Sequence, residues 1–439
     1  MGGNRWQISL PEVAAGTWNF EQLSVNGERR YRPTLPEDGY FLINHDAPAN
    51  EATGGNDVIG YGAGDINPEW ANRSDLEIEA YHIWTMSRMR VGAIDETNRN
   101  LTFTGKARSH FYPLDVGGRY RVVNVKEALH WAGQWYLDRP TGVLTYLAKP
   151  GEDPNRDRVL APRLERVMQI ENARDITFRG LSFTGTNVLP GAQGYTSHQG
   201  EIVISSAVEV RRARGLRFQG CNFENLGGWG IDLGADVHEC EVVACRLRDL
   251  GAGGVKIGST SKPESEAEVT SGNRVEDCVI SSGGRVYNAA LGVWIGHAAH
   301  NRVAWNEIGD FYYTGISVGW TWGYAPSVAQ GNIIEHNHIH HIGQNVLSDM
   351  GGIYTLGIST GSRLTGNHIH DVAAYNYGGW GIYFDEGTTN MEARDNLVYN
   401  CDYSPFDQHF GTLNRVENNI FANGRAGQMH RTRGDNDNR

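Results

Sequence analysis

One phrase returns along the second half of the chain, and this repeat limits the possible folds more than any other feature. Each copy has a polar residue, an apolar residue two places on, a variable loop, and then a glycine followed by alternating apolar residues. The first two copies run from Cys221 to Gly234 and from Cys245 to Gly258. Further copies open at Cys278, Asn306, Asn337, Asn367, Asn396 and Asn419, so that successive starts lie 23 to 33 residues apart. A fixed phrase separated by loops of varying length is typical of a solenoid.

The strands in this phrase are too short to bury a face alone, but stacked coils align their apolar residues into one core. The recurring Asn and Cys positions are in phase with the apolar ones, so they should point inward. Buried Asn amides need hydrogen-bond partners, which a ladder of Asn side chains on neighbouring coils provides. We therefore predict an all-β protein with a right-handed single-stranded parallel β-helix over residues 161–439.

Residues 1–160 have a different pattern and predict a β-rich accessory domain. Short strand candidates there are separated by Pro, Gly and Asp turns. They are Gln7–Leu10, Phe41–Ile43 and a hairpin of Trp135–Leu137 with Val143–Tyr146. The chain thus divides into two domains, with the boundary between residues 160 and 161.

Composition narrows the class of partner. The 439 residues carry a formal net charge of −12, which argues against a nucleic-acid partner because phosphate binding needs a basic surface. No stretch approaches the roughly 20 apolar residues of a membrane span. Met1–Trp6 has no apolar run of the signal-peptide kind. The five cysteines fit neither a disulfide framework nor a zinc spacing, so free and mostly buried thiols are expected.

Aligning the Gly-apolar strands predicts a column of outward side chains, about 4.8 Å apart per coil. In order along the solenoid, the column contains Asp232, Lys256, Trp294, Ser317, Tyr354, Tyr383 and Asp407. Two positions further on, Asp385 lies beside His409 of the next coil. Sugars bind by stacking on aromatic rings while charged groups take their hydroxyls. The column therefore supplies substrate-binding candidates: Asp232, Lys256, Trp294, Tyr354 and His409. For Asp232 and Lys256, an ion pair between the two is the favoured alternative.

The loop Gly319–Tyr324 follows one of these strands and is too aromatic for an ordinary solvated loop. Trp320, Trp322 and Tyr324 are therefore further substrate-binding candidates. The alternative is a loop that folds back and covers its own coil, which is as plausible for Trp320 as a binding role.

Two acidic phrases in neighbouring coils supply catalytic candidates: Asp349, and the pair Asp385 and Glu386. Glycosidic cleavage needs two carboxyl groups about 5 Å apart for retention or about 6.5–9.5 Å apart for inversion. Register is the obstacle, since Asp349 aligns with Gly378, which lies roughly 23 Å before Asp385 along a straight strand. The two acids can meet only if the loop 343–352 folds over the strand face. Taken alone, Asp349 fits a turn-capping role.

The histidines of two neighbouring copies suggest a metal site, but we favour a structural interpretation. Alternation places His338 against His368 and His340 against His370 on an outward face, with His341 beside them. A closed site needs a third convergent ligand, and none is evident from the spacing, so no metal is expected. Phosphate-binding glycine loops, a nucleophile elbow and a Cys-His dyad are absent from the sequence, and no cofactor is expected.

Several phrases together resemble the bacterial β-helix proteins around glycoside hydrolase family 141. They are Asn225–Gly230, Asp249–Val255, Gly319–Tyr324, Leu347–Tyr354, Gly378–Tyr383, Phe384–Gly387 and Gln408–Gly411, with a looser match at Trp135–Arg139. The resemblance implies α-L-fucosidase or xylanase activity with two acidic residues. It suggests Asp349 and Asp385 as that pair, with Glu386 as the substitute. It also implies a secreted or periplasmic protein, and relatives with further coils at both ends.

The sequence thus predicts a glycoside hydrolase, expected to be a monomer, that acts on plant or microbial polysaccharide. One alternative is a β-helix polysaccharide lyase with Lys256 as the candidate base. The other is a non-catalytic carbohydrate-binding solenoid.

Overall fold

The computed structural model describes residues 4–48, 55–107, 114–197 and 199–433. The chain forms two compact units, Met1–Leu164 with Asn187–His198, and Glu165–Thr186 with Gln199–Arg439. The sequence predicts a single division of the chain, between residues 160 and 161. The segment 187–198 returns to the first unit because its strand β17 (Tyr195–Thr196) pairs with β8 (Met86–Asp95) of that unit.

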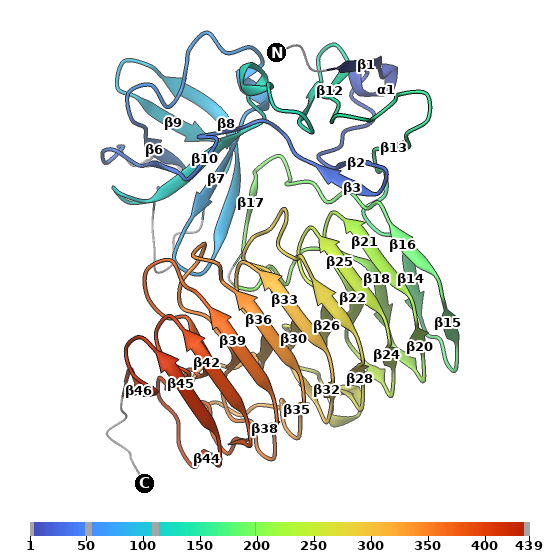
Figure 1. The fold of residues 1–439 in the computed structure, drawn as a ribbon, viewed down its shortest axis with the longest axis vertical. Coiled ribbons are helices and arrows are strands. Elements are labelled where there is room, and N and C mark those ends of the chain that lie inside the picture. The colour runs from blue at the N-terminus through green and yellow to red at the C-terminus, as the bar shows by residue number, and fades with distance from the viewer. Residues whose placement is uncertain (1–3, 49–54, 108–113, 198, 434–439) are drawn as a thin grey trace. The chain divides into compact units, whose positions relative to one another are not determined.

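The second unit is the predicted right-handed parallel β-helix, built from three long parallel sheets and a short one (Figure 1). The first sheet contains β14 (Met168–Glu171), β18 (Ser206–Arg211), β22 (Trp229–Leu233), β26 (Val255–Ile257), β30 (Val293–Ile295), β34 (Ile316–Val318), β37 (Gly351–Thr355), β40 (Trp380–Phe384), β43 (Phe406–Gln408) and β46 (Met429–Arg431). The second sheet contains β15 (Thr177–Arg179), β20 (Arg217–Gln219), β24 (Glu241–Val243), β28 (Arg274–Glu276), β32 (Arg302–Ala304), β35 (Ile333–Glu335), β38 (Arg363–Thr365), β41 (Glu392–Arg394) and β44 (Arg415–Glu417).

The third sheet lies side by side with these and completes each coil (Figure 1). It contains β16 (Ser182–Thr184), β21 (Asn222–Leu226), β25 (Arg246–Leu250), β29 (Val279–Ser281), β33 (Glu307–Phe311), β36 (His338–Ile342), β39 (His368–Val372), β42 (Leu397–Cys401) and β45 (Ile420–Gly424). The short sheet contains β19 (Ala213–Arg214), β23 (Val237–His238), β27 (Thr270–Ser271) and β31 (Ala298–Ala299), and a 3-10 turn, η3 (Glu266–Glu268), precedes β27. The inward apolar residues of these strands stack in register, and those of the central coils are fully buried, as at Ile231, Val255 and Val293.

The predicted asparagine ladder is confirmed. Asn337 Nδ2 donates to Asn367 Oδ1 of the next coil at 3.0 Å and to the carbonyl oxygen of Val303 at 2.9 Å. In turn, Asn337 Oδ1 accepts from Asn306 Nδ2 at 2.9 Å. Each buried amide is thereby satisfied by the coils on either side, which fixes the register of the stack. The same ladder continues through Asn396 and Asn419, and a second one, which the sequence analysis did not identify, joins Asn273, Asn301 and Asn332.

The first unit is made mainly of antiparallel strands. Its three-stranded sheet contains β1 (Arg5–Ser9), β12 (Val143–Leu147) and β11 (Trp135–Asp138), and includes the predicted hairpin. Its larger sheet contains β4 (Thr34–Leu35), β10 (Arg119–Val123), β7 (Glu77–Tyr81), β8, β9 (Asn100–Phe103) and β6 (Val58–Gly60), with β5 (Phe41–Leu42) and β17 at its side. A further sheet contains β13 (Val159–Leu160), β2 (Leu23–Val25) and β3 (Glu28–Arg30), and α1 (Pro11–Ala14), η1 (Arg73–Asp75) and η2 (Lys126–Ala128) complete the unit.

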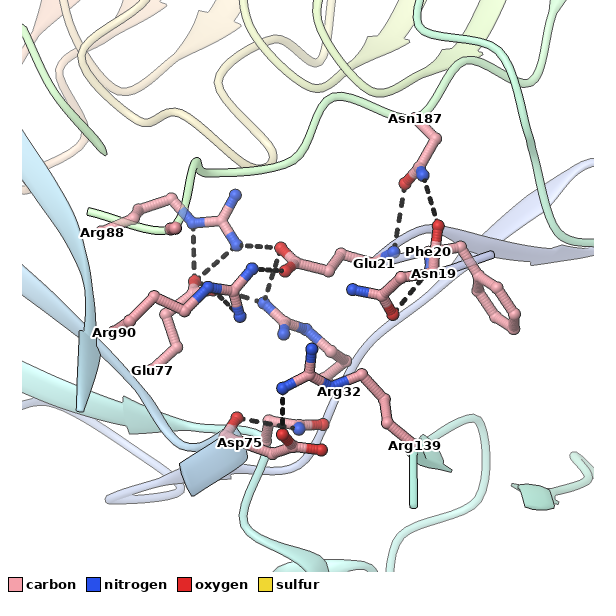
Figure 2. A network of polar contacts seen from close by, with 12 residues as sticks. Asn19, Phe20, Glu21, Arg32, Asp75, Glu77, Arg88, Arg90, Arg139 and Asn187 are labelled. Carbon is pink, nitrogen blue, oxygen red and sulfur yellow. Dashed lines mark hydrogen bonds and ion pairs between the residues drawn. The ribbon is translucent and has the colours of Figure 1, made fainter. Parts of the chain in front are cut away.

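A cluster of charged side chains is buried in this first unit (Figure 2). Arg88 Nη2 lies 2.7 Å from Glu21 Oε2, and Arg90 Nη2 lies 2.7 Å from Glu21 Oε1. Arg88 Nε donates to Glu77 Oε1 at 2.7 Å, and Arg32 Nη2 lies 3.3 Å from the same oxygen. Burial alone raises the pKa of Glu21, but the positive charges of the three arginines outweigh it and lower that pKa to about 2. Removing any one partner of this cluster would leave an uncompensated buried charge, so its acids and arginines depend on one another.

All five cysteines are free and buried, as predicted. The cysteines at the ladder positions donate to backbone carbonyls, as Cys245 Sγ does to the carbonyl oxygen of Phe218 at 3.4 Å. Among the described residues, no helix is long and apolar enough to cross a bilayer.

Candidate active site

The outward column of the first sheet has the register that the sequence predicts. Asp232, Lys256, Trp294, Ser317, Tyr354, Tyr383 and Asp407 pair successively across neighbouring strands. The backbone N–H of His409 donates to the carbonyl oxygen of Phe384 at 2.7 Å, which places His409 next to Asp385. The alternation of strand residues thus determines which side chains share this face.

Asp385 follows β40, and two tyrosines of the column hold its carboxylate. The hydroxyl of Tyr354 donates to Asp385 Oδ2 at 2.5 Å, and the hydroxyl of Tyr383 donates to Oδ1 at 3.0 Å. The side chain is half-buried. Burial raises the pKa of this carboxyl, while the two hydroxyl donors act in the opposite direction because they stabilise its ionised form.

Asp349 immediately precedes Met350 and β37, and its backbone adopts a left-handed conformation with φ of 54°. Its Oδ2 accepts a hydrogen bond from the hydroxyl of Tyr377 at 3.0 Å, and its carbonyl oxygen accepts one from the hydroxyl of Tyr313 at 3.2 Å. Its Oδ1 is buried and has no hydrogen-bond partner among the described residues. Burial raises the pKa of Asp349 to about 7, and the negative charge of Asp385 contributes to the rise.

The loop before β37 carries Asp349 to within electrostatic range of Asp385. The backbone N–H of Asp349 bonds to the carbonyl oxygen of Tyr377 at 3.1 Å, which keeps the aligned register with Gly378. The carboxyl group of Asp349 is nevertheless close enough to Asp385 for the negative charge of Asp385 to help raise its pKa. The hydroxyl of Tyr383 donates to Asp385 and also lowers the pKa of Asp349.

Aromatic rings fix the tyrosine hydroxyls at this pair. The ring centroids of Trp380 and Tyr383 lie 4.0 Å apart, and those of Tyr354 and Tyr383 lie 5.3 Å apart in an edge-on arrangement. All three rings are buried. Packed rings cannot rotate freely, so the hydroxyl groups that face Asp385 are held in place before any ligand binds.

A third acid, Asp407, belongs to the site and was not selected as a candidate. It is fully buried, with Oδ1 2.9 Å from His430 Nδ1 and Oδ2 3.1 Å from Thr432 Oγ1. Burial raises its pKa to about 6 against these partners, and Asp385 contributes by charge repulsion. The sequence did contain the signal, because Asp407 follows Tyr383 in the outward column.

The aromatic loop runs beside the turn that carries the acids. The backbone N–H of Gly323 donates to the carbonyl oxygen of Glu386 at 3.3 Å. A Cβ atom at Gly387 would lie 2.0 Å from the carbonyl oxygen of Gly323, so this approach requires glycine. Trp322 and Tyr324 are each 44 % exposed in this loop, which leaves their rings available to a ligand.

Trp320 lies deeper in the same loop. Its ring packs edge-on against Trp322 and Trp294, with centroids 4.9 and 5.3 Å apart. Trp294 itself is only 2 % exposed, so it supports Trp320 and does not face solvent. The expectation that Trp294 lines an open surface is corrected accordingly.

Glu386 and His409 lie at the edge of the site and are both half-buried. Burial and the charge of Asp385 raise the pKa of Glu386, whereas His409 and Arg433 lower it. His409 Nδ1 lies 2.8 Å from Thr432 Oγ1, and its ring packs on Phe410 with centroids 5.3 Å apart. Phe410 also contacts the ring of Tyr324, at 5.8 Å, so these residues form one continuous patch with the aromatic loop.

Lys256 and Asp232 are not part of this arrangement, and their role as substrate-binding residues is corrected. Both are buried, and Lys256 Nζ lies 3.3 Å from Asp232 Oδ2. Lys256 Nζ also donates to the carbonyl oxygens of Ile202 and Ile204, at 3.1 and 3.0 Å, and Arg211 lies 2.8 Å from Asp232. The mutual ion pair is therefore the correct alternative for these two residues.

The histidines differ from the expectation in one respect. His338 pairs with His368, and His340 with His370, as predicted. However, a third ring nitrogen does converge, because one nitrogen from each of His338, His368 and His370 lies within 4.8 Å of the others. The statement that no third ligand is available is therefore wrong.

The fold and site together place the chain among right-handed parallel β-helix proteins. A solved structure named "Glycoside hydrolase" superposes with a TM-score of 0.79 at 20% sequence identity, over 99% of this chain and 80% of that chain. An alginate lyase from Paenibacillus sp. str. FPU-7 gives a TM-score of 0.35 at 13% identity, over 61% of this chain and 92% of that chain. The catalytic domain of a GH87 alpha-1,3-glucanase in complex with tetrasaccharides gives 0.38 at 12% identity, over 98% and 99%.

These identities are low, so the likeness concerns the fold alone. No protein-family profile matches the chain, and no curated protein matches it either.

Proposed function

We propose that the protein is a glycoside hydrolase of xylanase or α-L-fucosidase type that acts on plant or microbial polysaccharide. One observation carries the proposal. Asp385, in the coil after Asp349, raises the pKa of Asp349 by its negative charge, and the turn that carries Asp385 lies beside a loop with exposed aromatic rings. Two carboxyl groups next to a stacking surface are what glycosidic cleavage requires. The implied location is secreted or periplasmic.

The two acids have different roles in this proposal. Asp349 is the general acid, because a pKa of about 7 leaves about half of it protonated at pH 7 and most of it protonated below that pH. Asp385 is the carboxylate, either nucleophile or general base, because the hydroxyls of Tyr354 and Tyr383 stabilise its ionised form. The charge on Asp385 helps Asp349 to keep its proton. If Asp385 serves only to position Glu386, then Glu386 is the catalytic carboxylate in place of Asp385.

The sugar rings stack on Trp322 and Tyr324, whose faces are the exposed ones in the aromatic loop. His409 and Glu386 take sugar hydroxyls at the edge of the same patch. Activity should decline above about pH 7, since a general acid without its proton cannot protonate the leaving oxygen.

The test separates the two roles by leaving group. Asp349→Asn should lose about 100- to 10,000-fold in kcat/KM on xylan or on alkyl xylosides and fucosides, but little on dinitrophenyl glycosides, whose leaving group needs no proton. Asp385→Asn should lose activity on both kinds of substrate. The control is Asp277→Asn, an exposed aspartate with a similar left-handed backbone, at φ of 55°. Full activity of the Asp385 variant would reject the assignment.

The same assays recognise the two alternatives. A polysaccharide lyase would release unsaturated sugar ends that absorb ultraviolet light. Its proposed base, Lys256, is buried in an ion pair, and burial raises the pKa of Tyr354 and Tyr383 well above the usual range, so neither tyrosine is a ready base. A binding solenoid would retain oligosaccharides without releasing any reducing ends.

A further inference from the structure

The outer face of the third sheet carries a cluster of imidazole rings that the proposed hydrolysis does not use. His338 on β36 pairs with His368 on β39, and His370 follows two residues later on the same strand. The rings of His338 and His368 stack with centroids 4.8 Å apart at 15°. These side chains alternate with the buried Ile339 and Ile369, so they point out of the core and are half-buried.

The ring nitrogens of these three histidines converge on one point. His338 Nε2 and His370 Nε2 lie 2.8 Å apart, and one nitrogen of His368 lies within 4.8 Å of both. Nitrogens bound to one tetrahedral Zn²⁺ at 2.0–2.1 Å lie about 3.3 Å from one another. One observed distance is 2.8 Å and none of the three exceeds 4.8 Å, so side-chain movements on the order of 1 Å bring all three nitrogens to ligand distance.

The surroundings orient the rings in the way that metal sites require. His370 Nδ1 lies 2.8 Å from Asp371 Oδ2, and the other oxygen of Asp371 accepts from Asn400 Nδ2 at 3.2 Å. A carboxylate that holds Nδ1–H leaves the lone pair of Nε2 free, and metal-binding histidines commonly have such a partner. That free lone pair points at His338 Nε2. The carboxylate, itself held by Asn400, thus fixes the ligand tautomer of His370.

A fourth group stands at the open side of the cluster. The hydroxyl of Tyr399 lies 3.1 Å from His368 Nε2, and the Tyr399 ring stacks on His370 with centroids 5.1 Å apart at 6°. His340 packs on His338 with ring centroids 4.5 Å apart, but both of its nitrogens have other partners, with Nδ1 2.8 Å from His341 Nδ1 and Nε2 3.6 Å from a carboxylate oxygen of Glu307. Three nitrogens and one open position therefore remain.

We propose that His338, His368 and His370 bind one divalent transition-metal ion, Zn²⁺ in particular, with water or the Tyr399 hydroxyl in the fourth position. Neutral imidazole suits Zn²⁺, Cu²⁺ and Ni²⁺, whereas Ca²⁺ and Mg²⁺ prefer oxygen ligands. The three ligands come from two coils, so the ion links β36 to β39. The site lies on the third sheet, whereas Asp349 and Asp385 lie at the first, and the ion is therefore structural.

The test uses the full chain without an affinity tag, freed of metal by a chelator and then titrated with ZnCl₂ or CoCl₂. We expect one Zn²⁺ per chain after dialysis by elemental analysis, visible absorption bands of tetrahedral Co²⁺, and a rise in the thermal midpoint. Asp371→Asn should weaken Zn²⁺ binding about 10- to 100-fold. His368→Gln and His370→Gln should weaken it further and remove the cobalt bands.

The matched control is His336→Gln, which changes an exposed histidine that stacks on Trp305 and is not one of the three ligands. It should bind Zn²⁺ as the unmodified chain does. The proposal is overturned if the unmodified chain retains no stoichiometric Zn²⁺, or if His336→Gln reduces binding as much as His370→Gln does. Circular dichroism before metal addition verifies that each variant is folded.

Discussion

Replacing Asp349 with asparagine should stabilise the protein at neutral and alkaline pH, although it removes the proposed general acid. The pKa of this carboxyl is about 7 in the folded chain, against about 3.9 in an unfolded one. At pH values below about 4 both states hold the proton, so the group has no effect. Between about pH 4 and 7 the unfolded chain releases it and the folded chain does not, so unfolding becomes easier as the pH rises.

Each unit of this difference is worth about 1.36 kcal/mol, so ionisable Asp349 reduces the free energy of unfolding by roughly 4 kcal/mol above pH 7. Asparagine carries no charge and escapes this penalty. Its amide oxygen can still accept from Tyr377, with a loss of about 1 kcal/mol relative to a carboxylate. Asparagine also tolerates the left-handed backbone at this position. The net gain should be roughly 2–3 kcal/mol above pH 7.

The assay is urea unfolding of the unmodified chain and of Asp349→Asn at pH 4 and pH 8. The gain in stability should appear at pH 8 and be absent at pH 4. Asp277→Asn has the same change of charge at an exposed position and should show no such dependence. If Asp349→Asn were less stable at pH 8, or differed equally at both pH values, the raised pKa could not be the reason for its behaviour.

Three further changes test other parts of the structure. Glu21→Gln should lower the free energy of unfolding by about 3–5 kcal/mol, because it breaks a buried ion pair with Arg88. Since the pKa of Glu21 is lowered to about 2, this contribution is full above about pH 4.5 and should disappear as the pH falls towards 2, which urea midpoints across that range would show. Asn337→Ala leaves its ladder partners unsatisfied and should cost about 3 kcal/mol or more, whereas Asn376→Ala, at an exposed position, should change the urea midpoint little. Trp322→Ala should raise KM about 2- to 10-fold with kcat nearly unchanged, since it removes a stacking surface and leaves the carboxyl groups in place.

The fold and the order of the outward column could be predicted because each coil repeats one glycine-anchored strand. Alternation then determines which residues face outward, and Tyr354, Tyr383 and Asp407 do lie in successive strands. From the sequence, an approach of Asp349 to Asp385 could be expected only if the loop 343–352 folds over the strand face. It depends on how a loop folds and on the hydroxyl of Tyr377, which comes from another loop without a repeating pattern.

The sequence does not show which segments cover the outer face of the first sheet. For this reason Lys256 and Trp294 were wrongly expected to be open to a substrate. Alternation places both residues outward correctly. The segment before β18 then folds over that face, and its carbonyl oxygens at Ile202 and Ile204 bind the Lys256 amine. The histidines show the same limit, because the repeat predicts that His338 stacks on His368, but the contact with His370 depends on side-chain rotamers.

The separation of inward from outward positions in each coil affects how such a molecule can change over generations. The buried ladder and apolar positions preserve the shape, and exchanging one of them disturbs two neighbours at once. Exposed outward positions such as Arg363 on the second sheet, by contrast, form a linear array in which one codon alters one outward side chain. Over generations, the exposed side chains can therefore change one coil at a time and give new binding specificities, while the buried core of the β-helix stays intact.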